Sequence, residues 1–204
     1  PEDDVIRSAL ATPTPRRLLW VAQAFRAGFD VEEIHDIAKY DPWYLERIKS
    51  LIEMEKEIKT GGLPINNEGW LKLKKAGFSD GRLADLRGCS EESVRQARHK
   101  HGVHPAYKRV DTCAAEIPSA TPYMYGCYEE SNFQGREYVS EIDDSVKQKI
   151  VILGSGPNRI GQGIEFDYCC VHAVYALKEA GYETIMVNCN PETVSTDYET
   201  ADRQ

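Results

Sequence analysis

The side chains most able to do chemistry in this 204-residue chain lie around a glycine-rich turn. Glu165 and Asp167 have the carboxyl groups of general acid–base catalysts, and Arg159 could bind a phosphate or a carboxylate. Each also has a structural interpretation. Asp167 would cap a helix, with Glu165 in the turn before it, and Arg159 would pair with an acidic neighbour such as Glu192 or Asp197. The residue types alone leave both interpretations open.

The spacing of the glycines argues against two common nucleotide sites. A dinucleotide fingerprint G-x-G-x-x-G that begins at Gly154 would need glycine at position 159, where the chain has Arg159. A phosphate-binding P-loop needs lysine after its second glycine, whereas Gln162 follows Gly161. A nicotinamide-binding protein and a Walker-type NTPase are therefore both disfavoured.

A strand, a helix and a second strand are expected to hold this turn. Residues 149–153 form a short β-branched run, which predicts a strand buried on both faces of a parallel sheet. Residues 167–180 have apolar residues at helical spacing, and Gly181 is expected to end that helix. Residues 183–188 predict the second strand. In such a βαβ unit the turn lies at the carboxyl end of the first strand, where doubly wound sheets bind ligands.

The chain upstream of His104 predicts a bundle of short helices, each with its own start and stop signals. Leu18 and Leu19 are expected to point inward from the first helix, and Tyr44 and Leu51 from the longest. The predicted helices cover residues 16–27, 31–38, 42–61, 67–76, 80–87 and 90–101. The fold class is thus a mainly α-helical domain followed by a truncated α/β segment.

The predicted domain organisation has three parts. A helical domain with an extended C-terminal arm covers residues 1–128, and a polar linker covers 129–148. The α/β segment covers 149–204 and is short for a complete doubly wound sheet, so its sheet edge should be exposed or borrowed.

Composition and charge exclude several classes of function. A net charge of −8 argues against a nucleic-acid partner, which would need a clustered cationic face. The absence of an apolar run of about 18 residues and of a signal-peptide pattern predicts a cytoplasmic protein without a membrane partner. None of the six cysteines forms a C-x-x-C pair, and the group His99, His101 and His104 fits a helix end better than a metal site.

The sequence around the turn resembles the large subunit of carbamoyl-phosphate synthase. The phrases that carry the resemblance are G-S-G-P-N-R-I-G-Q-G-I-E-F-D-Y at 154–168, N-C-N-P-E-T-V-S-T-D at 188–197, H-P-A-Y-K-R-V-D-T-C-A-A-E at 104–116 and T-P-Y-M-Y at 121–125. Residues before about 100 are similar to the oligomerisation domain of that family, and residues after 148 to the start of its second synthetase half. The resemblance implies an internal fragment of such a subunit.

The resemblance also implies an activity for the parent enzyme. It would be an ATP-grasp ligase that makes carbamoyl phosphate from bicarbonate and from ammonia released from glutamine, for arginine and pyrimidine synthesis. One ATP would activate bicarbonate and a second would phosphorylate carbamate, each with Mg²⁺ or Mn²⁺. The fragment itself would bind no cofactor or metal and contain no catalytic residue. Its partners would be other large subunits and a glutaminase small subunit.

The residues matched by the resemblance suggest a role for the fragment. Glu165 and Glu192 match glutamates that line an interior passage for an unstable intermediate, and Gly163 would belong to the same passage. Asn158 and Arg159 would face a ligand. An alternative from a different class is a non-catalytic helical scaffold with a vestigial nucleotide fold.

Overall fold

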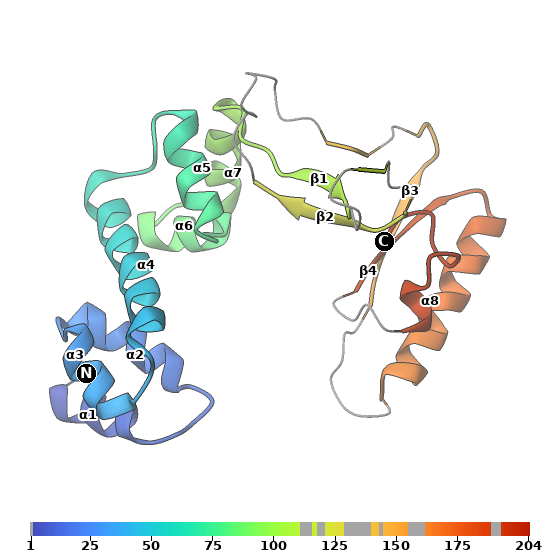
Figure 1. Ribbon diagram of the computed structural model, residues 1–204. Coiled ribbons are helices and arrows are strands. Elements are labelled where there is room, and N and C mark those ends of the chain that lie inside the picture. The colour runs from blue at the N-terminus through green and yellow to red at the C-terminus, as the bar shows by residue number, and fades with distance from the viewer. Residues whose placement is uncertain are drawn as a thin grey trace. The chain divides into compact units, whose positions relative to one another are not determined.

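The computed structural model describes residues 2–110, 116–117, 121–128, 140–142, 145–154, 162–188 and 193–204, with backbone alone for 162–166. Contacts divide the chain into two compact units, Pro1–His104 and Pro105–Gln204. The first unit is built of helices, and the second contains short strands and one long helix (Figure 1). The predicted fold class, a helical domain followed by an α/β segment, is confirmed.

Seven helices form the described part of the first unit. Helices α3 to α7 each begin after a capping residue whose side chain accepts a hydrogen bond from a backbone N–H of the first turn. The capping residues are Asp30, Asp41, Asn66, Ser79 and Ser90. Six of the helices lie within a residue or two of their predicted bounds. The helices are α1 (Asp3–Ala11), α2 (Arg17–Ala27), α3 (Val31–Ala38), α4 (Pro42–Gly61), α5 (Asn67–Lys75), α6 (Asp80–Arg87) and α7 (Glu91–Lys100).

Helix α4 is shared by two packing groups of the helical unit. It packs with α2 and α3, and α1 completes this group, while it also packs against α6. The core of the first group consists of Ile6, Leu10, Val21, Ala24, Phe29, Ile34, Ala38 and Leu45. Each large apolar side chain buried in this way contributes about 1.5–3 kcal/mol of hydrophobic free energy.

The predicted inward faces of α2 and α4 are partly wrong. The side chains that are exposed instead are Leu18 (54%), Leu19 (64%), Tyr44 (60%) and Leu51 (38%). Helix α2 buries the narrower face that contains Val21 and Ala24, and Leu18 and Leu19 lie outside that face. The apolar pattern of the sequence is therefore wider than the surface that the fold buries.

The second unit contains the predicted βαβ arrangement. Strands β3 (Lys149–Leu153) and β4 (Glu183–Val187) pair in parallel, and α8 (Gln162–Glu179) connects them. Val174, Met186 and Ala201 form the core beneath α8. The prediction that the first strand is buried on both faces is wrong, because Val151 is 54% exposed and Leu153 is 76% exposed. Among the described elements, α8 covers one face of the pair.

A second small sheet precedes the βαβ arrangement. Strands β1 (Ala106–Arg109) and β2 (Met124–Cys127) pair antiparallel, and Glu141 N–H donates to the Tyr107 carbonyl at 2.8 Å. The Gln204 backbone joins this region to the chain end, since Met124 N–H donates to the Gln204 carbonyl at 2.7 Å. The described residues between 105 and 128, which fall in the predicted arm of the helical domain, thus belong to the second unit.

The edge of β4 is occupied by the end of the chain. Ile185 forms an isolated parallel bridge with Arg203, and Met186 N–H donates to the Arg203 carbonyl at 2.9 Å. Asp202 accepts hydrogen bonds from the backbone and the hydroxyl of Thr184, both at 2.9 Å. These contacts continue the sheet by one bridge beyond β4, and they come from the same α/β segment.

No helix in the described part of the chain is both long enough and apolar enough to cross a membrane.

Candidate functional site

The carboxyl ends of β3 and β4 lie side by side because the two strands are parallel. Gly154 directly follows β3, and its N–H donates to the Val187 carbonyl at 2.8 Å. Asn188 directly follows β4, and its side chain fills the space beside Gly154. A Cβ atom at position 154 would lie 2.6 Å from Asn188 Nδ2 and 2.8 Å from its Cγ. Glycine is therefore needed here for close packing.

Three polar side chains meet at this edge, and we refer to Asp167, Asn188 and Ser195 as the Asp167 network. Ser195 lies in the 3₁₀ turn η1 (Val194–Thr196), and its hydroxyl donates to Asp167 Oδ1 at 3.0 Å. Asn188 Nδ2 donates to Ser195 Oγ at 3.2 Å and lies 3.4 Å from Asp167 Oδ1. Asp167 is 2% exposed and Ser195 is fully buried. The network thus ties α8 to both sides of the segment 189–192.

The helix-capping interpretation of Asp167 is wrong. Helix α8 begins at Gln162, so Asp167 lies inside the helix and its carboxylate points to the buried network. The start predicted from the sequence was too late because Gly163 weakens helix propensity and obscures the first turn.

Ser195 and Thr196, which are neighbours in η1, use their hydroxyl groups differently. Thr196 Oγ1 donates to the Thr193 carbonyl at 2.8 Å, as expected of a loop hydroxyl, whereas Ser195 binds a side chain.

The positions predicted from the sequence to line the passage or face a ligand have no described side chains. Gly163 and Glu165 lie in α8, where the structure describes the backbone alone. Asn158, Arg159 and Glu192 lie outside the described residues. Sequence reasoning did not assign a role to Asn188. The signal that could have identified it is a polar side chain directly after one strand, opposite a glycine directly after the neighbouring strand.

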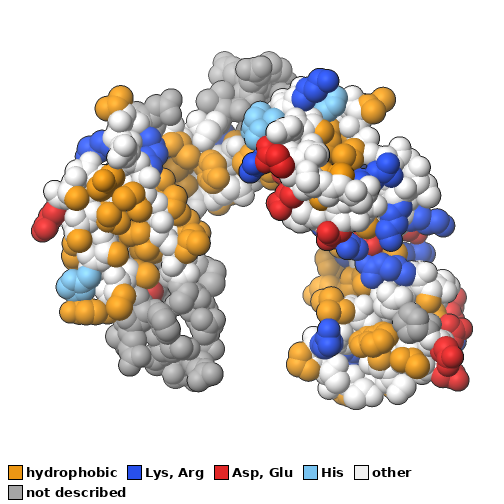
Figure 2. Space-filling view, turned by 180° about the vertical axis from the view of Figure 1, so that it is seen from behind, with side chains coloured by type: hydrophobic (Ala, Val, Ile, Leu, Met, Phe, Trp, Pro, Cys, Tyr) orange, Lys and Arg blue, Asp and Glu red, His pale blue; other side chains and the backbone are white. Residues whose placement is uncertain are grey.

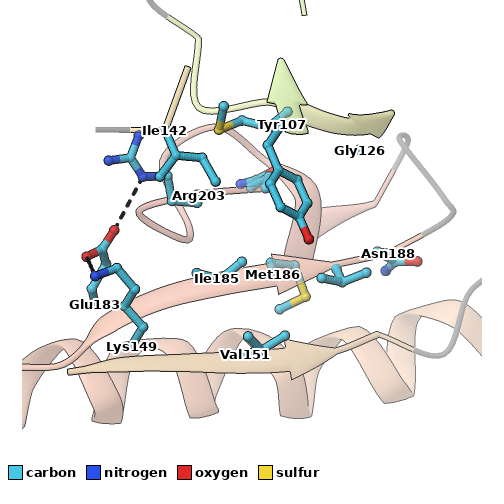
Figure 3. A pocket seen from close by; sticks show the side chains of 13 residues that line it. Tyr107, Gly126, Ile142, Lys149, Val151, Glu183, Ile185, Met186, Asn188 and Arg203 are labelled. Carbon is cyan, nitrogen blue, oxygen red and sulfur yellow. Dashed lines mark hydrogen bonds and ion pairs between the residues drawn. The ribbon is translucent and has the colours of Figure 1, made fainter. Parts of the chain in front are cut away.

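A groove of about 550 Å³ lies in the second unit over the face of β3 and β4 that α8 leaves open. Figure 3 shows Tyr107 pointing from β1 toward β4, above Val151, Ile185 and Met186. The groove wall is therefore mainly apolar, and Asn188 of the Asp167 network lines one part of it.

Charged side chains line another part of the groove. The Glu183 carboxylate, 6% exposed, pairs with Arg203 Nε at 3.3 Å and with Lys149 Nζ at 3.7 Å (Figure 3). Burial opposes ionisation of Glu183, but hydrogen bonds from Ser145 and Arg203 and the charge of Lys149 outweigh it. The pKa of Glu183 therefore lies below its ordinary value. This ionised, paired carboxylate fastens the chain end to β4 and is poorly suited to accept a proton.

Within the described ranges, the chain has no group of three or more His, Cys, Asp or Glu side chains that could hold a metal ion. The His99 and His104 rings lie 4.3 Å apart at the end of the helical unit.

The described fold defines a class of protein, a helical bundle followed by an α/β segment with a βαβ arrangement. A family model described as "Carbamoyl-phosphate synthetase large chain, oligomerisation domain" matches residues 1–102. A second model, "Carbamoyl phosphate synthase preATP-grasp domain", matches residues 146–204. The chain therefore belongs to the carbamoyl-phosphate synthase large chain family, and the resemblance seen in the sequence is confirmed.

Curated relatives described as carbamoyl phosphate synthase large chains match nearly the whole chain. The Brucella melitensis protein is 57% identical over 202 residues, which is 99% of this chain. The Rhizobium meliloti protein is 56% identical over 98% of the chain, and the Pseudomonas aeruginosa protein is 54% identical over 98%. The chain spans 17%, 17% and 18% of the lengths of these three relatives.

Proposed function

We propose that this chain is a central stretch of the large chain of a glutamine-hydrolysing carbamoyl phosphate synthase. The observation that carries the proposal is the match of two domains of that large chain, in order, to residues 1–102 and 146–204. The helical unit and the βαβ arrangement of the structure coincide with these two matches.

The whole enzyme would be an ATP-grasp ligase that serves arginine and pyrimidine synthesis in the cytoplasm. It would form carboxyphosphate from bicarbonate and one ATP, convert it to carbamate with ammonia from glutamine, and phosphorylate carbamate with a second ATP. ATP and Mg²⁺ or Mn²⁺ would bind in parts of the large chain outside this stretch, so no step is assigned here to the described residues. This stretch would have two roles, the assembly of large chains with one another and the containment of carbamate in a passage.

Containment is the role proposed for the carboxyl edge of β3 and β4. Glu165, Glu192 and Gly163 would form part of the wall of a passage through which carbamate travels, and Asn158 and Arg159 would face a ligand. A passage for a species that water decomposes needs polar walls that are shielded from bulk solvent. Support comes from the buried Asp167 network, which is adjacent in sequence to both glutamates.

Assembly is the role proposed for the helical unit, through contacts with other large chains. The first turns of α2 and α4, two helices that pack together, expose large apolar side chains. Figure 2 shows hydrophobic side chains at the surface of the helical unit. Side chains exposed by 54–64% in these turns are Leu18, Leu19, Trp43 and Tyr44. A glutaminase small subunit would be the second protein partner, and the net charge of −8 disfavours nucleic acid.

The test uses the full-length large chain with its glutaminase subunit, and measures carbamoyl phosphate formed from glutamine, bicarbonate and ATP. We expect product from this complex and none from the 204-residue chain alone. Glu192→Gln should reduce glutamine-dependent synthesis by about ten-fold or more while bicarbonate-dependent ATP hydrolysis continues, because the wall loses a charge. Glu179→Gln, at an exposed position late in α8, is the matched control. A folded full-length complex that makes no carbamoyl phosphate would overturn the proposal.

A further inference from the structure

The Asp167 network joins elements that are far apart in the sequence. Asp167 belongs to α8, Asn188 follows β4, and Ser195 lies in η1. The bond of 3.0 Å from Ser195 to Asp167 spans 28 positions of the chain. Because its three members belong to different elements, the network sets the separation between α8 and the chain that returns after β4.

Because the Asp167 network is buried, its hydrogen bonds determine the position of η1 relative to α8. A carboxylate that is 2% exposed depends on protein donors in place of water, and a hydroxyl that is 0% exposed has the same need. If one donor is removed, the remaining groups must move or admit water to regain a partner. A change at Ser195 should therefore displace η1 relative to α8.

The network also brackets the two glutamates of the proposed passage. Residues 189–192 lie between Asn188 and Ser195, and Glu165 precedes Asp167 by two positions on the same helix. We propose that Asp167, Asn188 and Ser195 are positioning residues, which set the spacing of the passage wall and so keep carbamate from water. This inference rests on the proposed function.

A positioning role and a purely structural role differ in one measurable quantity. Loss of stability lowers the amount of folded enzyme, and it reduces ATP consumption and carbamoyl phosphate formation by the same factor. A displaced wall instead lets carbamate escape and decompose after its ATP has been consumed. The ATP consumed per carbamoyl phosphate formed is therefore the quantity that separates the two roles.

The experiment uses the full-length large chain with its glutaminase subunit and glutamine as nitrogen source. Ser195→Ala should raise the ATP consumed per carbamoyl phosphate by about two-fold or more, because carbamate reaches water. Thr200→Val is the matched control. Thr200 is 3% exposed and its hydroxyl donates to the Val194 carbonyl at 3.0 Å, a bond that stays within the same segment and does not reach α8. This variant should keep the wild-type ratio.

A second variant keeps the test decisive if Ser195→Ala fails to fold. Asp167→Asn preserves the size of the side chain and removes its charge, and it should raise the same ratio. The double variant should match the larger single effect, since both changes break one network. Wild-type ratios in folded Ser195→Ala and Asp167→Asn would overturn the positioning role while leaving the proposed function intact. A wild-type complex that makes no carbamoyl phosphate would instead overturn the proposed function and the inference with it.

Discussion

Glu55 on α4 binds two arginines that come from the two packing groups of the helical unit. Arg26 of α2 donates to one of its carboxylate oxygens at 2.8 Å, and Arg82 of α6 donates to the other at 3.0 Å. Burial opposes ionisation of Glu55, but the hydrogen bonds and charges of Arg82 and Arg26 outweigh it, so its pKa lies below the ordinary value. The ionised form of Glu55 therefore stabilises the fold.

Glu55→Gln should lower the free energy of unfolding by about 1–3 kcal/mol at neutral pH, because the charge-assisted bonds to both arginines are lost. Folding favours ionised Glu55, so its contribution is present above the unfolded pKa, near 4.5, and is lost as the pH falls through the lower folded pKa. The difference between wild type and variant should therefore shrink in acid. Urea unfolding monitored by circular dichroism at several pH values measures it.

Glu57→Gln on the same helix provides the matched control. The Glu57 side chain is 71% exposed and lies 4.0 Å from Lys72 Nζ, so its removal should change the free energy of unfolding by less than about 0.5 kcal/mol. Equal losses in both variants, or a Glu55→Gln difference that is independent of pH, would contradict the assignment of Glu55 as the ionised link.

Side chains that meet across elements set the limit of sequence reasoning at the residue scale. Leu45 and Ile58 lie in the apolar pattern of the predicted helix 42–61, and both are buried. It did not indicate that Glu55 would be buried between two arginines or that Asp167 would face Ser195, which lies 28 positions away. Polar pairs of this kind depend on how the elements pack, and helical periodicity contains no such information.

At the scale of elements, the starts of α3 to α7 were predictable because a capping side chain acts within one turn. Asp30 accepts the Glu33 N–H at 2.8 Å, and Glu33 accepts the Asp30 N–H at 3.2 Å, which completes a capping box at α3. Helix α3 in turn contributes Ile34 and Ala38 to the core of the first packing group. A local signal of this kind is visible in a single sequence.

Asp30→Ala should lower the free energy of unfolding by about 1 kcal/mol, because the Glu33 N–H at the start of α3 loses its side-chain acceptor. Asp36→Ala on the same helix is the control. Asp36 is 79% exposed and lies 3.7 Å from Lys39 Nζ, so its loss should have little effect. Paired urea denaturation curves give the comparison, and an Asp36→Ala loss as large as that of Asp30→Ala would argue against the capping box.

Three elements were missed or misplaced for physical reasons. Helix α1 was not predicted, although Ile6 and Leu10 on one of its faces are fully buried, because only its packing against α2 and α3 reveals that face as core. Strands β1 and β2 are each four residues long, and they pair with each other. The periodicity of one short strand does not indicate which distant segment it pairs with.

At the scale of the whole molecule, composition indicated the order of the domains but not the point of division. The contact division falls between His104 and Pro105, whereas the sequence placed a linker at 129–148. Polar composition marked the latter stretch as a connector. Within it, however, the Glu141 carboxylate accepts the Arg109 N–H at 2.8 Å and pairs with Lys108 at 3.1 Å. A polar stretch can thus lie within a compact unit and need not be a linker.

The exposed turn at the start of α4 gives a test of assembly for the full-length large chain. Trp43 and Tyr44 pack edge to face with ring centroids 5.0 Å apart, and they are 62% and 60% exposed. The double change Trp43→Glu and Tyr44→Glu should weaken self-association by about ten-fold or more, because buried aromatic side chains dominate protein interfaces. Their exposure in one copy predicts little loss of fold, which circular dichroism checks. Ile65→Glu, at a position 88% exposed between α4 and α5, should leave the dissociation constant unchanged. Sedimentation over a range of concentrations measures these constants, and equal values for the double variant and wild type would show that assembly uses another surface.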